Sequence, residues 1–136
     1  MTEPLLFSPF RLGNLELKNR VVMSPLTRNR SIGNVPGDLV VTYYQQRSEA
    51  GLIVTEGTSP SPNGLGYPRI PGIFSAEQVA AWKKVTDAVH AGGAKIFSTH
   101  VGEPASPSFA SSQFKSFGPQ TGIDIRRART FPASEV

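Results

Sequence analysis

A short apolar strand that runs directly into a proline-containing turn is the feature that most constrains the fold of this chain. Residues 20–23 (Arg-Val-Val-Met) are predicted to form a buried strand, which Ser24-Pro25 ends because proline cannot donate to a β-ladder. Leu26 and Thr27 follow at once, and they can present main-chain amides and one hydroxyl at the carboxyl end of that strand. Barrel enzymes of the α/β class carry their active sites at this end of their strands. We therefore expect a functional site in this turn.

The first strand is followed by a helix and a second strand. The apolar spacing in residues 38–50 predicts a helix that begins after Pro36-Gly37 and ends at Gly51. Residues 52–55 (Leu-Ile-Val-Thr) are a continuous apolar run, which is typical of a strand buried on both faces of a parallel sheet. The order strand, helix, strand predicts a βαβ unit.

A second unit begins with a long connection and a well-marked helix. Residues 56–74 are rich in Gly, Pro and Ser and have no periodicity, and a connection of this length in a compact domain is commonly functional. Ser75 and Gln78 have the spacing of a capping box at the start of a helix. Gly92-Gly93 ends that helix, and residues 95–98 are predicted to form a third strand. The core-facing stripe of the helix is predicted to consist of Val79, Trp82, Val85 and Val89.

A hairpin is predicted ahead of the first strand. Residues 10–17 alternate apolar and polar side chains around Gly13-Asn14, so that Arg11 would face Glu16, and the hairpin would cover the bottom of the core. Two consecutive βαβ units favour a parallel sheet of three strands, and the expected fold is a partial (β/α)8 barrel at most, because a complete one needs roughly 200 residues or more. Residues 1–102 form this part, whereas residues 103–136 are predicted to be a loop or disordered tail.

The composition excludes several kinds of site. The chain has no cysteine, which rules out disulfides, thiolate metal sites and cysteine nucleophiles, and its two histidines have no carboxylates at metal-ligand spacing. The 14 basic residues exceed the 10 acidic ones and are scattered, except for Arg28 with Arg30 and the trio Arg126, Arg127 and Arg129, so the net charge of +4 predicts no nucleic-acid partner. No apolar run reaches membrane-spanning length, and the start Met1-Thr2-Glu3-Pro4 is not basic. A cytoplasmic protein with no metal and no membrane partner is therefore expected.

Polar side chains follow each predicted strand. They are Ser24, Thr27 and Arg28 after the first strand, Thr55, Glu56 and Thr58 after the second, and Ser98, Thr99 and His100 after the third. Gly57 has no Cβ, so a flat ring can approach its main chain, and Pro25 offers a rigid apolar surface. This pattern is consistent with a planar cofactor, with ordinary turns as the alternative. A carboxylate such as Glu56 more commonly holds a neighbouring loop than acts as a general base.

Seven segments of the chain occur in an order that is specific to one family. They are residues 6–27, Gly33-Asn34-Val35-Pro36, Thr55-Glu56-Gly57-Thr58, Ser61-Pro62-Asn63-Gly64, Gly66-Tyr67, Pro71-Gly72-Ile73 and residues 82–90. Together they resemble the amino-terminal part of the old yellow enzyme family, over residues 5–102. An ordered match of this length is far more specific than a single short motif.

The resemblance implies a (β/α)8 barrel that binds FMN without a covalent link and uses NAD(P)H to reduce activated carbon-carbon double bonds of small-molecule substrates. By position, Pro25, Leu26 and Thr27 would contact the flavin ring, with the Thr27 hydroxyl near a flavin carbonyl. Gly57 would lie against the same ring. In such an enzyme the protein supplies binding and electronic tuning, and the cofactor carries out the hydride chemistry.

Two departures from the family pattern bear on activity. Where the family has Gln-Leu-Trp-His-Val-Gly-Arg, residues 98–103 are Ser-Thr-His-Val-Gly-Glu, so the flavin-contacting glutamine and the tryptophan are missing and Glu103 replaces a basic residue. Loss of one amide contact weakens FMN binding by on the order of 1 kcal/mol. The family's substrate-binding pair, its proton-donating tyrosine and its phosphate-binding loops lie in later strands, outside the sequence in hand.

Three hypotheses of function follow. The first is a truncated or split FMN-dependent oxidoreductase of the ene-reductase type, completed as a homo-oligomer or by a complementing polypeptide, because an open parallel sheet leaves unpaired edges. The second is a flavin-free homologue that catalyses a non-redox isomerisation or cyclisation, or that binds a small hydrophobic ligand. The missing glutamine and tryptophan motivate the second. The third is a fragment with no activity of its own.

Overall fold

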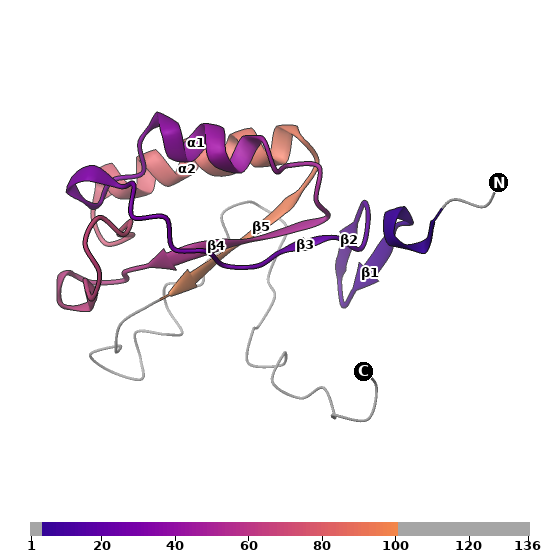
Figure 1. Ribbon diagram of the computed structural model, residues 1–136, viewed down its shortest axis with the longest axis horizontal. Coiled ribbons are helices and arrows are strands. Elements are labelled where there is room, and N and C mark those ends of the chain that lie inside the picture. Colours follow the sequence, from indigo (N-terminus) through magenta and orange to yellow (C-terminus); the bar gives the residue numbers. More distant parts are fainter. Residues whose placement is uncertain (1–3, 101–136) are drawn as a thin grey trace, which may run out of the picture.

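A three-stranded parallel sheet with two helices on one face forms the centre of the computed structural model, which describes residues 4–100 (Figure 1). The predicted tail at residues 103–136 lies outside the described residues. In chain order the elements are η1 (Leu5–Phe7), β1 (Phe10–Leu12), β2 (Leu15–Leu17), β3 (Val22–Met23), η2 (Ile32–Asn34), α1 (Asp38–Gln45), β4 (Leu52–Thr58), η3 (Pro62–Gly64), α2 (Ala76–Ala91) and β5 (Lys95–His100).

The strand order is β3-β4-β5, and both pairings are parallel. Ile53 of β4 lies opposite Met23 of β3 on one side and Ile96 of β5 on the other. The predicted sheet of three parallel strands with intervening helices is therefore confirmed. The loops that follow β3 and β4 gather at the carboxyl ends of the strands, and the β1–β2 hairpin lies at the opposite end (Figure 1).

α2 begins at the capping box that the sequence predicted. Ser75 Oγ accepts a hydrogen bond from the Gln78 amide at 3.2 Å, and Gln78 Oε1 accepts one from the Ser75 amide at 3.1 Å. The helix ends before Gly93, whose φ of +83° is a conformation that favours glycine.

The core lies between the two helices and the helix-covered face of the sheet. Its buried residues are Val40, Tyr44, Ile53, Ile73, Trp82, Val85, Val89 and Ala94. Three members of the predicted α2 stripe belong to this core, but Val79 is 42% exposed and the prediction was wrong for it. Gln78, one residue before Val79, is buried instead, because it lies one turn before Trp82 on the buried face of α2.

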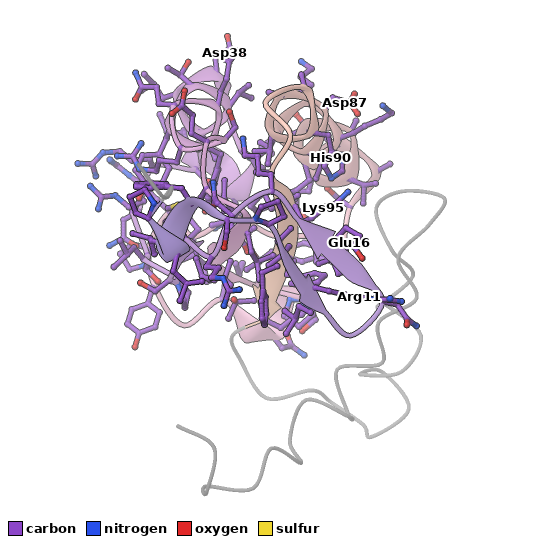
Figure 2. The ribbon with its side chains drawn as sticks, turned by 90° about the vertical axis from the view of Figure 1, so that its right-hand side faces the viewer. Arg11, Glu16, Asp38, Asp87, His90 and Lys95 are labelled. Atoms are coloured by element: carbon purple, nitrogen blue, oxygen red, sulfur yellow. The ribbon has the colours of Figure 1, made fainter. Side chains whose placement is uncertain are left out.

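The predicted hairpin is confirmed. β1 and β2 pair antiparallel with Arg11 opposite Glu16, and Arg11 Nε lies 3.5 Å from Glu16 Oε1 (Figure 2). This exposed ion pair contributes little to stability. Leu15 and Leu17 contribute more, because they are buried against Leu52 of β4 and cover the amino end of the sheet.

The strands differ in length and exposure from the prediction. β3 has two residues, and Val22 is 52% exposed, so the predicted buried strand is an edge strand with one described neighbour. β4 continues to Thr58 and β5 to His100, beyond the predicted ends, because the two strands pair with each other after a register shift. The first helix is shorter than expected, since α1 ends at Gln45 and turns continue to residue 49.

Open strand edges remain in the described part of the chain. Within residues 4–100, β3 and β5 each pair on one side only, and helices cover one face of the sheet (Figure 1). None of the helices described is long and apolar enough to cross a membrane.

The two valines on α2 that differ in burial test this core directly. Val85→Ala should lower the free energy of unfolding by about 2 kcal/mol, because it removes two buried carbons and leaves a cavity. Val79→Ala, the matched control on the exposed side, should change it by less than about 0.5 kcal/mol. Chemical denaturation followed by circular dichroism measures both values. Equal effects of the two substitutions would contradict the observed packing of α2.

Candidate functional site

The residues expected to contact a flavin come together at the carboxyl ends of two neighbouring strands. Pro25, Leu26 and Thr27 lie on the loop directly after β3, and all three are exposed. Gly57 is buried and lies within β4, not in a turn after it as predicted. It is paired with Thr99 of β5, just past the register shift between these strands. The site therefore consists of an exposed loop beside the end of the central strand.

The loop after β3 offers hydrogen-bond donors. Within residues 4–100, no group accepts a hydrogen bond from the main-chain amides of Leu26 and Thr27. The Thr27 hydroxyl belongs to the same exposed segment. Main-chain amides and a hydroxyl suit the carbonyl oxygens and ring nitrogens of a flavin, and Pro25 provides an apolar surface beside them. The donor set of this segment fits one edge of a flavin ring.

Glu56 ties this loop to the central strand. Glu56 is 1% exposed, and its carboxylate accepts a hydrogen bond from the main-chain amide of Arg28 at 3.0 Å. Burial raises the pKa of Glu56, and the hydrogen bond and charge of Arg28 partly oppose this rise. Glu56 holds a neighbouring loop, as the sequence favoured.

Tyr44 of α1 fixes the main chain of β4 at the same point. Its hydroxyl accepts a hydrogen bond from the Glu56 amide at 2.7 Å, and burial raises the pKa of Tyr44 above its ordinary value. The sequence analysis did not identify this contact. The helical period places Tyr44 on the same face as Val40, which indicates burial, but no local signal indicates which group its hydroxyl would meet.

A cavity of about 200 Å³ lies between α1 and the loop after β3. The Arg28 guanidinium stacks 5.2 Å from the centre of the Tyr43 ring at this place. The lining residues are Arg28, Arg30, Leu39, Val40, Tyr43 and Glu56.

The loops after β3 and β4 are bound to each other. The Ser31 amide donates to the Arg69 carbonyl at 3.0 Å, Asn34 Nδ2 donates to the Ile70 carbonyl at 2.7 Å, and the Gly72 amide donates to the Asn34 carbonyl at 2.8 Å. Asn34 and Arg69 have φ values of +61° and +55°, in the left-handed region, which asparagine tolerates but which is uncommon for arginine. Such conformations persist where surrounding contacts hold them, and they are common at functional sites.

The third strand contributes a different set of groups. The Thr99 amide donates to Thr55 Oγ1 at 3.0 Å, so β5 is joined to β4 through a side chain as well as through the ladder. Burial lowers the pKa of His100, which favours its neutral form. His90 lies away from these loops, in the last turn of α2 (Figure 2). In the part of the chain that the structure describes, no three His, Asp or Glu residues form a group that could hold a metal ion.

Comparisons with known proteins identify close relatives. Residues 5–124 match the model of the NADH:flavin oxidoreductase / NADH oxidase family. The chain is 51% identical over 100 residues to 12-oxophytodienoate reductase 7 of Oryza sativa subsp. japonica, a match that covers 71% of this chain and 25% of the relative. The solved structure of morphinone reductase superposes with a TM-score of 0.70 and 48% identity, covering 74% of this chain and 27% of that one.

The old yellow enzyme homologue from Zymomonas mobilis gives a similar result. Its structure has a TM-score of 0.69 and 47% identity, and the match covers 73% of this chain and 28% of that one. The chain thus spans about a quarter of the length of these relatives. The family match also extends past residue 103, into the segment that the sequence analysis assigned to a divergent tail.

The contact between Tyr44 and Glu56 can be tested by removing one hydroxyl. Tyr44→Phe should lower the free energy of unfolding by about 1 to 3 kcal/mol, because it leaves the buried Glu56 amide without an acceptor. Tyr67→Phe removes a hydroxyl from a side chain that is 61% exposed, and its effect should stay within about 0.5 kcal/mol. Denaturant titration of both variants makes the comparison. A Tyr44→Phe variant as stable as the control would contradict this anchoring role.

Proposed function

This chain belongs to the NADH:flavin oxidoreductase / NADH oxidase family, the family of the old yellow enzymes, and from this premise we propose that it provides one side of the FMN site of an ene reductase. In this proposal Pro25, Leu26 and Thr27 contact one edge of the flavin ring, and Gly57 lies against the ring from β4. The single observation that carries the proposal is the exposed loop after β3, whose free donors lie beside the end of the central strand.

The chemistry divides between cofactor and protein. When bound, FMN supplies the hydride transfer by which two electrons from NAD(P)H reach an activated carbon-carbon double bond. The residues of this chain bind and orient the ring. The amides of Leu26 and Thr27 and the Thr27 hydroxyl donate hydrogen bonds to it, and these donors favour electron density on the flavin oxygens and nitrogens.

FMN binding by this chain is weaker than by a family member with the usual third-strand sequence. His100-Val101-Gly102 matches the His-Val-Gly of the family pattern, so Phe97 stands where the resemblance places the flavin-contacting glutamine, and the nearby Thr99 amide is already engaged with Thr55. One hydrogen bond less corresponds to about a fivefold higher dissociation constant.

The open edges of the sheet require a partner in this proposal. A second copy of the chain, or a polypeptide with the remaining strands, pairs with β3 and β5 and covers exposed apolar side chains of β3, of the loop after it and of α1. These side chains are Val22, Leu26, Ile32 and Leu39. Pairing of free edges is favourable because their main-chain donors and acceptors have no neighbour in the described sheet.

Titration with FMN tests the cofactor assignment. Added FMN should change its absorbance between about 370 and 460 nm on binding, because the ring leaves water for the protein surface. Thr27→Val should raise the dissociation constant about fivefold through loss of one hydrogen bond. Thr42→Val, the same change on the exposed face of α1, should leave it unaltered.

Each outcome of this titration has a separate meaning. A wild-type chain whose addition leaves the FMN spectrum unchanged would refute the cofactor assignment and favour the flavin-free alternative, a non-redox isomerase or cyclase or a binder of small hydrophobic ligands. Flavin binding that is insensitive to Thr27→Val would refute the role of Thr27 alone.

Light scattering during size-exclusion chromatography tests the partner. The isolated chain should elute as an assembly of at least two copies, with a mass well above the 14.6 kDa of one chain. Val22→Lys at the open β3 edge should shift the protein toward the monomer, whereas Val79→Lys on α2 should not. A stable monomer for the wild-type chain would contradict self-association.

A further inference from the structure

Glu56 fixes the main chain immediately after the segment proposed to contact the flavin. Its Oε2 atom accepts the hydrogen bond of the Arg28 amide at 3.0 Å, and Arg28 is the residue that follows Thr27. The main-chain amides of Arg28 and Asn29 both stabilise the charged form of the carboxyl group. Asn29 has a φ of +55°, so the chain bends sharply where the carboxylate holds it.

Glu56 is itself held rigidly. Its main-chain amide donates to the Tyr44 hydroxyl at 2.7 Å, and its carbonyl oxygen accepts hydrogen bonds from the hydroxyls of Thr55 and Thr58, each at 3.0 Å. The Thr55 hydroxyl also accepts from the Thr99 amide of β5. The carboxylate is therefore attached to a point that α1, β4 and β5 fix together, and hydrogen-bonded groups of this kind position a neighbour accurately.

The loop is incompletely packed at this place, where the Arg28 guanidinium over the Tyr43 ring joins it to α1. The cavity of about 200 Å³ separates part of the loop from α1, and Glu56, Arg28 and Tyr43 are among its lining residues. A buried carboxylate costs free energy unless donors compensate it, and a neutral side chain would avoid that cost. A charged acceptor gives the stronger hydrogen bond to a main-chain amide, which suits a loop that borders a cavity.

We propose that Glu56 is a positioning residue, which sets Pro25, Leu26 and Thr27 in the geometry that contacts the flavin ring. This inference rests on the proposed FMN site and adds to it a residue that does not touch the cofactor. The next residue, Gly57, is the proposed contact from β4. Glu56 holds the loop after β3 and Gly57 is the contact from β4. These two successive residues therefore set the loop and the strand end in position relative to each other.

Glu56→Gln tests this role, because glutamine keeps the size of the side chain and loses its charge. The dissociation constant for FMN should rise about tenfold, since hydrogen bonds to charged groups are the stronger ones. The absorbance maximum and the reduction potential of the bound flavin should also shift, because the Thr27 hydroxyl moves relative to the ring. Glu49→Gln, which removes the same charge from an exposed residue, should change none of these values.

The amide resonance of Arg28 gives a readout that needs no flavin. In the wild-type chain without FMN, this proton should resonate downfield, and Glu56→Gln should move it upfield while Glu49→Gln leaves it in place. In the wild-type chain the Arg28 amide resonance should also move upfield when falling pH protonates Glu56. This should happen at a pH above the ordinary pKa of a glutamate, because burial raises the pKa of Glu56. The charged and titratable groups facing Glu56 are Arg28 and Arg30 from the loop and Tyr43 and Tyr44 from α1. The pH titration applies even where Glu56→Gln fails to fold.

The outcomes separate this inference from the function on which it rests. A wild-type chain that binds FMN, beside a Glu56→Gln variant with the same affinity and spectrum, would overturn the positioning role alone. An Arg28 amide that does not respond to Glu56 would do so as well. A wild-type chain that binds no FMN while its Arg28 amide still responds to Glu56 would overturn the proposed function, and the positioning role with it.

Discussion

The parallel pairing of β4 with a strand on each side is the constraint on which the rest of the structure depends. Parallel strands need long connections, and here α1 and α2 supply them and cover one face of the sheet. The same pairing brings the carboxyl ends of the strands to one edge, so the loops after β3 and β4 meet there. The hairpin can cover only the opposite end, where Leu15 and Leu17 pack on Leu52.

Polar contacts bind the loop after β3 to the carboxyl end of the sheet. Tyr44, Thr55 and Thr58 bind the main chain around Glu56, and the Glu56 carboxylate binds the loop after β3. Apolar packing acts beside these contacts, because Ile73, on the connection after β4, belongs to the buried core. Removing one member of a buried polar network costs free energy of folding, because its partner is left without a hydrogen bond. A complete network, however, fixes the orientation of its groups, which apolar packing does not. This arrangement suits a framework that holds a binding loop in a defined geometry.

Features with a local signal could be predicted from the sequence. The capping box at Ser75 and the turn at Gly13-Asn14 each contain the residues that determine their structure, and both were found as expected. The lengths of β4 and β5 depend on pairing between distant segments, so they exceeded the prediction. The exposure of Val22 depends on which strands lie beside β3, and the contact of Tyr44 with the Glu56 amide joins residues 12 positions apart. No local pattern carries that information.

The central claim is that the loop after β3 and the end of β4 form one flavin-binding surface. Chemical-shift mapping of an isotope-labelled chain during addition of FMN tests it most directly, because each amide reports its own surroundings. The account predicts that the largest changes fall on Leu26, Thr27 and Gly57, with smaller ones on Arg28 through Glu56. Changes confined to the β1–β2 hairpin or to the outer face of α2, or none at all, would contradict it.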